Sequence, residues 1–522
     1  MKKDKTIILV FLISILSVFL FLFKINQMPL NADEASNAYD AYSILKTGKD
    51  QYGNFLPLRF VSFGDYKLPL LTYLAIPWIK FLGLNELAIR LVNLPFVFLF
   101  PIIVYLLVND FFQNKIIALI SAFLVAFSPG IQLLAKQAHE GYLTAFFLTV
   151  SFYFFIKSIK SKSIIYYPLF IINFLLTLFG YHSSRLWIGF FLLSIIYFIY
   201  KKIFNLKHLI LFLTTIFIFL ITDFYYKPTR VTNLLFFNNQ GFISKTKELQ
   251  NEAKSRFFYN EIVVGLKEIL NQYLIYFSPQ FLVIEGDKNY RFGFPGISPI
   301  TYVEYLFLFI GLYYLFKNKE KWRYLILAIF LFAPLSGSLT WAGQSITRTI
   351  FIFIPILIIS AYGFYNFLRQ KNYFFSLLIS ILYLIFLFYS WEFYFYHYPK
   401  RAIVIRSWQA GYKELTQYIK ENYQNFDRFY ITKKNGQPYI FLLFYLKYPP
   451  EKYQKIAKLS SPDEYGFGQI NEFNKFYFEL WPIKEKNKYV VVGYPDDFNL
   501  ATEKNLKQIK IGTETIFLIK EV

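Results

Sequence analysis

The stretch that decides the fold class is residues 6–23, TIILVFLISILSVFLFLF, which a short connection joins to residues 31–34, NADE. An uncharged apolar run of this length can cross the hydrocarbon core of a bilayer as one helix. Lys2, Lys3 and Lys5 precede the run and no small-residue cleavage site follows it, so we expect a retained helix and not a signal peptide. Two adjacent carboxylates therefore lie where the chain leaves the membrane.

Composition places the chain among membrane proteins before any motif is considered. Of its 522 residues, 56% are hydrophobic and 22% are aromatic, which is more apolar surface than a soluble domain can bury. The net charge of +22 would suit a nucleic-acid partner, but the Lys and Arg residues lie mainly between apolar runs, so we expect no nucleic acid. The absence of Cys excludes disulfides, thiolate catalysis and Cys-ligated metal.

The spacing of the apolar runs predicts an α-helical polytopic protein of the cell membrane, plasma or inner, with about eleven spans in a range of about ten to thirteen. The expected spans are residues 6–23, 86–108, 116–127, 141–156, 164–179, 186–200, 209–222, 299–316, 324–335, 349–368 and 373–390. Lys and Arg gather in alternate connections, which sets the N-terminus in the cytoplasm. Residues 68–84 are apolar but contain Pro69 and Pro77, so we expect a helix lying in the membrane interface.

Domain organisation follows from the same pattern. Residues 1–397 are expected to form the transmembrane domain, and residues 398–522 a small external α/β domain. The expected external loops are residues 24–85, 128–140, 180–185, 223–298 and 336–348. Within the C-terminal part, residues 408–423 have helical spacing, whereas residues 429–432 and 489–493 are typical of β-strands.

Ionisable residues collect at the predicted external helix ends, although they are scattered over more than three hundred residues of sequence. This set comprises Asp33, Glu34, Lys67, His139, Glu140, His182, Arg185 and Arg348. Basic residues on the external side run against the usual bias, so Lys67, Arg185 and Arg348 suggest a bound anion. The active site is therefore expected on the external face, as is the C-terminal domain.

Each of these residues also has a purely structural interpretation. Asn31 followed three residues later by Glu34 fits a capping box, and Glu140 precedes a span whose dipole it would favour. His182 fits a hydrogen-bonded interfacial histidine, Arg185 and Arg348 fit arginines that extend to the headgroups, and Lys67 fits a solvated loop lysine. Their joint occurrence on one side favours function over these alternatives.

Several stretches together carry a family resemblance. They are an external Asp-Glu after one span, YKLPLLTYL at 66–74, NELAIRL at 85–91, Ser-Pro at 128–129 before EGYL at 140–143, YHSSR at 181–185, and Arg348 with Pro355. In this order the chain resembles the GT-C membrane glycosyltransferases, specifically the protein mannosyltransferase and aminoarabinose transferase group, over roughly residues 1–390. It departs from that group with Leu68 where a proline is frequent and Glu140 where Asp is frequent.

The resemblance implies a hexosyl- or pentosyltransferase that moves a sugar from a polyprenyl-phosphate carrier to a protein, lipid or glycan hydroxyl. In this chemistry Asp33 would be the base, with Glu34 and Glu140 orienting hydroxyl groups. Lys67, Arg348 and Arg185 would hold the donor phosphate, whereas His139, Tyr66, His182 and Arg291 are candidates for substrate contact. A divalent cation held by Asp33 and Glu140 stays open, and the apolar segment at 68–84 suits a prenyl groove.

Two other function classes stay open from the residues alone. An enzyme resembling an O-antigen ligase or polymerase would use the same class of lipid donor, but it is expected to rely on external arginines without the early Asp-Glu pair. A lipid or sugar transporter would place its ionisable residues near the membrane centre, often beside broken helices in related halves.

Overall fold

The computed structural model describes residues 5–161, 163–226, 235–252, 257–341, 343–370, 373–460, 468, 470–480, 487–500, 503 and 505–522. Lys2 and Lys3, on which the predicted orientation partly rests, lie outside the described residues. The chain divides into two compact units. Unit 1 comprises Met1–Lys24 and Asn93–Tyr394, and unit 2 comprises Ile25–Val92 and Phe395–Val522.

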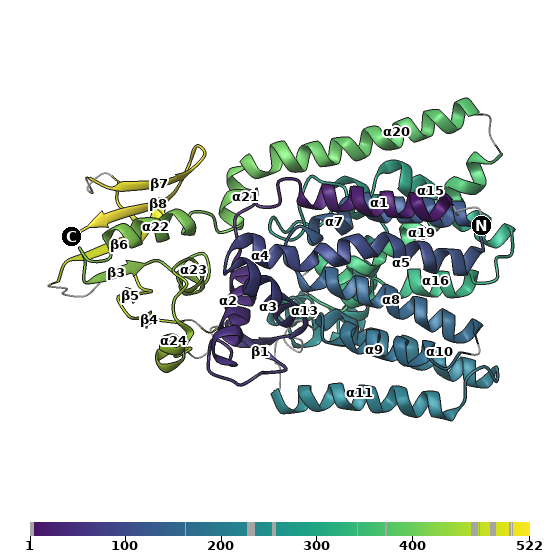
Figure 1. Cartoon of the computed structure of the whole chain (residues 1–522), viewed down its shortest axis with the longest axis horizontal. Coiled ribbons are helices and arrows are strands. Elements are labelled where there is room, and N and C mark those ends of the chain that lie inside the picture. The colour runs from purple at the N-terminus through teal and green to yellow at the C-terminus, as the bar shows by residue number, and fades with distance from the viewer. Residues whose placement is uncertain are drawn as a thin grey trace. The chain divides into compact units, whose positions relative to one another are not determined.

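Unit 1 is a helical bundle whose long helices run side by side (Figure 1). Its long helices are α1 (Lys5–Leu22), α5 (Leu94–Phe112), α6 (Lys115–Phe127), α8 (Glu140–Lys160), α9 (Tyr166–Leu178), α10 (Trp187–Tyr200), α11 (Leu206–Tyr226), α15 (Tyr302–Lys317), α16 (Arg323–Phe332), α19 (Phe353–Leu368) and α20 (Tyr373–Glu392). Each expected span contains or overlaps one of these helices. The prediction of a polytopic α-helical membrane protein is confirmed.

Length separates these helices into two groups. Among the described residues, seven helices are long and apolar enough to cross a membrane, and the bent pair formed by α6 and α7 (Pro129–Ala135) would make an eighth. Helices α6, α9, α15 and α16 have 13, 13, 16 and 10 residues, below the roughly 20 that a full crossing needs. The length criterion alone therefore accepts fewer spans than the eleven expected.

Small residues allow close helix packing at the centre of unit 1. A Cβ on Gly311 of α15 would lie 2.0 Å from the Ile359 carbonyl oxygen of α19, and one on Gly363 would lie 2.3 Å from that of Phe307. Only glycine fits at both positions, because backbone lies against backbone there. This arrangement is typical of membrane helices, whose association depends on close packing.

Residues 128–140, expected as an external loop, contain the helix α7, all of whose residues are buried, and their external side stays a prediction. Helix α7 is bent by 51° from α6. Directly after it, the buried Lys136 ammonium donates to the carbonyl oxygens of Leu20, Phe21 and Phe23, each at 2.8 Å. These are unsatisfied acceptors at the end of α1, so Lys136 caps that helix.

The described part of the expected loop at 223–298 also carries helices. These are η3 (Phe236–Asn238), α13 (Gln240–Glu252), α14 (Glu261–Ile275) and the π-helix η4 (Gln280–Ile284). The remaining short elements of unit 1 are η2 (His182–Leu186), α17 (Leu335–Ser338), α18 (Ile346–Thr349) and η5 (Ile350–Ile352).

Unit 2 combines two segments distant in sequence. The first contains α2 (Ala32–Thr47), the antiparallel hairpin β1 (Phe60–Ser62) and β2 (Asp65–Lys67), α3 (Leu70–Leu82) and α4 (Glu86–Arg90). The second contains α21 (Ala402–Ser407), α22 (Tyr412–Asn422), α23 (Pro438–Tyr445) and α24 (Pro450–Ile456) with a six-stranded sheet. The segment expected as a helix at 68–84 contains α3, and its place in the membrane interface stays a prediction.

The sheet of unit 2 is mixed. Its strands are β3 (Arg428–Ile431), β4 (Glu472–Phe473), β5 (Phe476–Tyr477), β6 (Tyr489–Gly493), β7 (Lys507–Ile511) and β8 (Glu514–Glu521), in the order β4-β5-β3-β6-β8-β7. The strands expected at 429–432 and 489–493 are β3 and β6. The helix expected at 408–423 is α22, which begins four residues later because Gln409 and Gly411, with φ of 55° and 94°, separate it from α21.

Candidate functional site

The Asp-Glu pair lies at the start of α2, and its two members have different surroundings. Asn31 caps the helix by accepting from the Glu34 N–H at 3.0 Å. The Glu34 carboxylate in turn accepts from the Asn31 N–H at 3.2 Å, which completes the capping box. Glu34 is 1% exposed. Glu34 therefore has the capping role that its spacing from Asn31 predicts.

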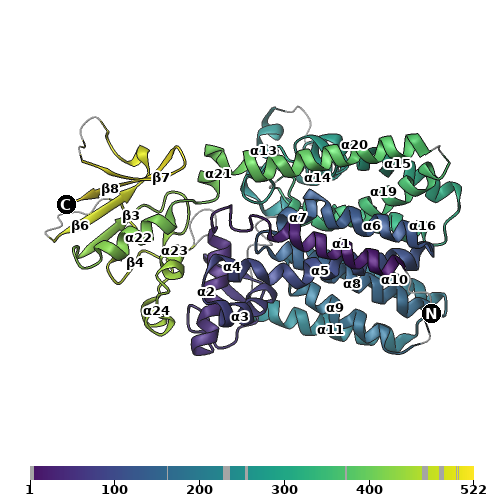
Figure 2. The ribbon, with the colours of Figure 1, turned by 45° about the horizontal axis from the view of Figure 1, so that its top comes forward.

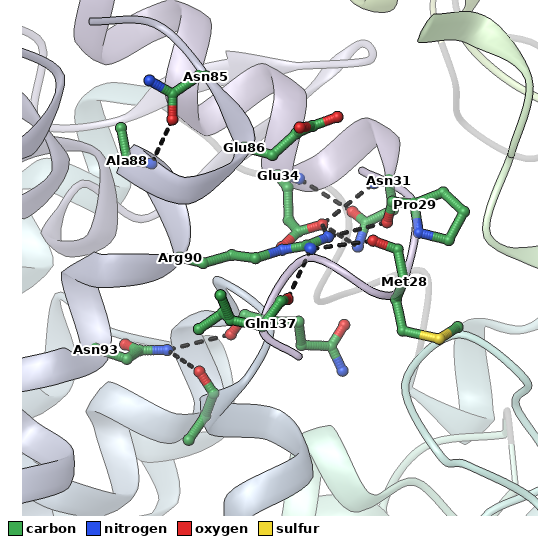
Figure 3. Close-up of polar contacts among 12 residues, drawn as sticks. Met28, Pro29, Asn31, Glu34, Asn85, Glu86, Ala88, Arg90, Asn93 and Gln137 are labelled. Atoms are coloured by element: carbon green, nitrogen blue, oxygen red, sulfur yellow. Dashed lines mark hydrogen bonds and ion pairs between the residues drawn. The ribbon is translucent and has the colours of Figure 1, made fainter. Parts of the chain in front are cut away.

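Arg90, the last residue of α4, holds the same carboxylate (Figure 3). Its Nε and Nη2 atoms lie 2.9 and 3.0 Å from the two Glu34 oxygens. Its other N–H groups donate to the carbonyls of Ile25, Met28 and Pro29, each at 3.0 Å. All five guanidinium donors thus have partners. Arg90 therefore holds the connection that follows α1 against the first turn of α2.

Asp33 differs from its neighbour in both exposure and partners. Its side chain is partly exposed, and among the described residues its carboxylate has no hydrogen-bond or ion-pair partner. Only its backbone is engaged, since its carbonyl accepts from Asn37 Nδ2 at 3.1 Å. The backbone of Asp33 is fixed by the capping box, while its carboxylate is available to a ligand.

Lys67, at the end of β2, contacts two polar side chains of α2. Its ammonium donates to Ser36 Oγ at 2.7 Å and lies 3.1 Å from Asp40 Oδ2. Burial raises the pKa of Asp40 to about 6, although the Lys67 charge lowers it. Because this value lies above that of an unfolded aspartate, the Asp40 contribution to the free energy of unfolding falls as the pH rises from about 4 to about 6. Tyr66 is paired across the hairpin with Val61.

Gln409 connects the first turn of α2 to the C-terminal part of unit 2. It is 5% exposed, and its Oε1 accepts from the Ala32 N–H at 3.0 Å. Its Nε2 donates to the Asn435 carbonyl at 2.8 Å, in the loop after β3. The amide therefore joins the residue preceding Asp33 to a chain segment about four hundred residues away.

In unit 1, the second acidic candidate begins α8. Glu140 is partly exposed, and His139 before it caps the helix, with Nδ1 accepting from the Gly141 N–H at 2.9 Å. The His139 ring contacts Phe292 and Tyr181 at centroid distances of 5.1 and 5.5 Å. Three segments distant in sequence therefore meet beside the start of α8.

Arg348 lies in α18, which packs against this end of α8. A Cβ on Gly141 would approach the Thr347 carbonyl oxygen to 3.1 Å, so the two backbones are close there. The Arg348 guanidinium donates to Thr340 Oγ1 at 2.8 Å and is half-buried. Within the described part of the chain it has no carboxylate at ion-pair distance. Its positive charge is thus available to an anion.

The segment carrying Arg348 is attached by two buried groups. Asp287 accepts from the Ile346 N–H at 2.8 Å, and the Tyr276 hydroxyl accepts from the Ser345 N–H at 2.9 Å. Burial raises the pKa of Asp287 and raises the pKa of Tyr276 to about 12. Both groups act on the backbone just before Arg348.

The other basic candidates in unit 1 are engaged differently. Arg185 forms an ion pair with Asp223 at 2.9 Å. His182 begins η2 and is partly exposed. Arg291 lies over the Phe292 ring at 5.7 Å, and its carbonyl accepts from Gln137 Nε2 at 3.5 Å. Gln137 is itself held through its own carbonyl, which accepts from Asn93 at 3.1 Å (Figure 3).

Four residues that organise these surroundings were not singled out from the sequence: Arg90, Asp287, Tyr276 and Gln409. The sequence does contain a signal for Arg90, because an arginine inside an apolar run is costly unless it has a specific role. In the part of the chain that the structure describes, no cluster of three His, Asp or Glu side chains suits a metal ion. A cation between Asp33 and Glu140 stays a prediction.

Comparison with known proteins identifies the fold. No protein-family model and no curated protein matches the sequence. Among solved structures, ArnT from Cupriavidus metallidurans in the apo state matches with a TM-score of 0.55 and 12% identity, over 97% of each chain. The same protein bound to undecaprenyl phosphate gives 0.52 and 13% over the same shares. The chain has the GT-C fold.

A second kind of GT-C protein matches more weakly. The archaeal oligosaccharyltransferase AglB from Archaeoglobus fulgidus, in complex with an inhibitory peptide and a dolichol-phosphate, gives a TM-score of 0.48 and 14% identity over 85% of this chain. The present chain spans 64% of the length of AglB.

Arg90→Met is expected to destabilise unit 2 strongly. The change leaves the Glu34 carboxylate buried without its cation, which typically costs about 3–5 kcal/mol. Thermal unfolding of the detergent-solubilised protein measures the effect. Adding Glu34→Gln should restore part of the loss, and Lys80→Met on the exposed side of α3 should change little. A loss no larger than that of the Lys80 variant would contradict the structural role of the pair.

Gln409→Ala is expected to loosen the turn that carries Asp33. The Ala32 N–H loses its buried acceptor, which typically costs about 1–3 kcal/mol. Hydrogen–deuterium exchange of a peptide spanning residues 30–36 should accelerate. The matched control is Gln417→Ala, because Gln417 is exposed on α22. Equal exchange in both variants would show that Gln409 does not hold this turn.

Proposed function

We propose that the chain is a membrane glycosyltransferase that transfers a sugar from a polyprenyl-phosphate donor to an acceptor hydroxyl on the outer face. The observation that carries this proposal is the contrast between Asp33 and Glu34. Glu34 is buried and fully engaged with Arg90, whereas the Asp33 carboxylate is partly exposed and has no partner among the described residues. Such a carboxylate, on a rigid backbone, suits a general base.

The proposed reaction is a single displacement. Asp33 takes the proton of the acceptor hydroxyl as that oxygen attacks the anomeric carbon of the sugar. The bond between the anomeric carbon and the phosphate oxygen breaks, and the polyprenyl phosphate leaves with the electron pair. One attack from the opposite face inverts the configuration at the anomeric carbon. Glu140 is proposed to orient sugar or acceptor hydroxyls.

Arg348 is the proposed contact for the donor phosphate. Of the three basic candidates, Lys67 is balanced by Asp40 and Arg185 by Asp223. Arg348 is held only by the neutral Thr340 hydroxyl among its described neighbours. A fixed guanidinium without a carboxylate at ion-pair distance stabilises the negative charge that develops on a leaving phosphate. Lys67 and Arg185 rank after Arg348 as candidates for this role.

The apolar side chains around a small cavity of about 20 Å³ in unit 1 are proposed to contact the prenyl chain. Its lining is entirely apolar and consists of Leu107, Phe111, Phe152, Ile326, Ile329, Phe351, Ile354, Pro355 and Ile358. Four of these follow Arg348 in η5 and α19. At about 1.5 Å per residue, they extend to about 15 Å from it. A lipid with its phosphate at Arg348 would therefore meet apolar side chains along η5 and α19 with its first isoprene units. ArnT, with the same fold, has been crystallised with undecaprenyl phosphate.

Asp33→Asn is expected to abolish transfer, with a loss of about 10²–10⁴-fold because the amide cannot accept the hydroxyl proton. The lipid-linked sugar that accumulates in cells lacking the protein identifies the donor. Purified protein is then assayed with that donor, and in parallel with a panel of polyprenyl-phosphate hexoses and pentoses. The control is Asp427→Asn, because Asp427 is exposed. Full transfer by Asp33→Asn would overturn the proposal.

Arg348→Gln should lower kcat/KM for the donor more than Arg185→Gln does. The first change removes a cation that faces an anion, whereas the second breaks an internal pair with Asp223. A transition-state charge contact of this kind is worth about 10²–10³-fold. Steady-state kinetics with varied donor concentration provides the test. A larger loss for Arg185→Gln, at equal thermal stability, would assign the phosphate to Arg185.

A further inference from the structure

We propose that α14 lies on the outer membrane surface with one face in the lipid and thereby anchors the segment that carries Arg348. The basis is an exposed apolar stripe along this helix. Ile262, Leu266, Leu270 and Leu274 recur every four residues and are 67%, 59%, 57% and 57% exposed. Residues at this spacing share one face of a helix.

The opposite face of α14 already has a partner. Val264 packs with Phe236 and Phe242 in a small core that also includes Trp341. A Cβ on Gly265 would lie 2.7 Å from the Phe237 ring, so no space is left on that side. The helix therefore cannot rotate to bury the exposed stripe, because its other face is already packed.

The neighbouring helix α13 provides an internal contrast. Both helices belong to the same small core and lie near each other in the external loop (Figure 2). The exposed residues of α13 are polar and include Ser244, Lys247, Glu248 and Asn251. Two helices of one core thus present different outer faces, one suited to water and one to an apolar phase.

Lipid is the occupant that the surroundings favour. The Tyr273 hydroxyl of α14 donates to the Leu331 carbonyl near the end of α16 at 2.8 Å, and Phe277 contacts Phe330 of α16 at 4.9 Å. The apolar stripe is thus continuous with the exposed side of the apolar helix α16, where Leu331 is 43% exposed. The exposed Phe257 and Phe258 precede α14, and aromatic residues are enriched at membrane interfaces.

The anchored helix leads directly to Arg348. Tyr276 is the C-cap of α14, is fully buried, and accepts from the Ser345 N–H at 2.9 Å. Lipid contact along α14 would hold this tyrosine, and through it Arg348, near the depth of lipid phosphates. This second step rests on the proposed function, because it assumes that Arg348 receives a lipid phosphate.

Site-directed spin labelling tests the lipid contact without any activity assay. The chain contains no Cys, so single-Cys variants label without background. Leu266→Cys and Leu270→Cys report on the stripe, and Ser244→Cys on α13 is the matched control. Each full-length variant is labelled with a nitroxide in nanodiscs of phosphatidylethanolamine and phosphatidylglycerol. Collision with lipid-soluble oxygen is compared with collision with a water-soluble nickel chelate.

The oxygen-to-nickel ratio is expected to be several-fold higher at 266 and 270 than at 244. A ratio at the stripe equal to that at 244 would overturn the lipid contact. Strong immobilisation of labels 266 and 270 with low access to both reagents would indicate a protein partner on this face and would equally overturn it.

A kinetic test addresses the anchoring step. Leu266→Glu/Leu270→Glu is expected to raise KM for the lipid donor several-fold with kcat little changed, whereas Ser244→Glu should leave both unchanged. An unchanged KM together with the expected spin-label pattern would reject the link to Arg348 and keep the lipid contact. Activity of Asp33→Asn would reject the proposed function while leaving the spin-label result intact.

Discussion

The bidentate contact between Arg90 and Glu34 is the interaction on which the surroundings of Asp33 depend. Removing two charges from water is costly, and the cost is offset only where the remaining donors and acceptors are also satisfied. Arg90 meets that condition, because its three other N–H groups end on carbonyls of the connection after α1. The ion pair therefore joins α2, α4 and this connection. As a result the backbone of Asp33 is fixed, while its side chain stays partly exposed, unlike that of Glu34.

Charge balance distinguishes the structural cations of this chain from those available for chemistry. Lys136 is buried, yet its ammonium is satisfied by three carbonyls at the end of α1. Lys67 and Arg185 each have a carboxylate partner. Arg348 has only a hydroxyl among the described residues, while Asp287 and Tyr276 hold the backbone beside it. Arg348 acts on Asp287 through its charge but has no carboxylate at ion-pair distance among these residues, which leaves its N–H groups able to bind an external anion.

The sequence predicted those features that depend on local periodicity. The membrane helices, the strands β3 and β6 and the capping box at Asn31 and Glu34 all follow from residues within one or two turns of each other. It could not predict contacts that depend on folding over long distances. Glu34 meets Arg90 across 56 residues, and Gln409 meets Ala32 across 377. Helix α7 was missed for a related reason, since Pro and Gly in a short segment favour a loop until burial enforces a helix.

The break between α6 and α7 bears on the choice between an enzyme and a transporter. In transporters, broken helices leave backbone groups free to bind ions or substrate near the membrane centre. Here several groups at the break have protein partners, although the buried Gln132 Oε1 has none in the described part of the chain. The Gly130 N–H and the Ser128 hydroxyl both donate to the Pro299 carbonyl, at 2.8 and 3.1 Å, and Gln132 donates to Ser17 Oγ at 3.0 Å. A break satisfied in this way is part of the packing. The partly exposed carboxylates lie elsewhere, with Asp33 in the first turn of α2 and Glu140 in that of α8.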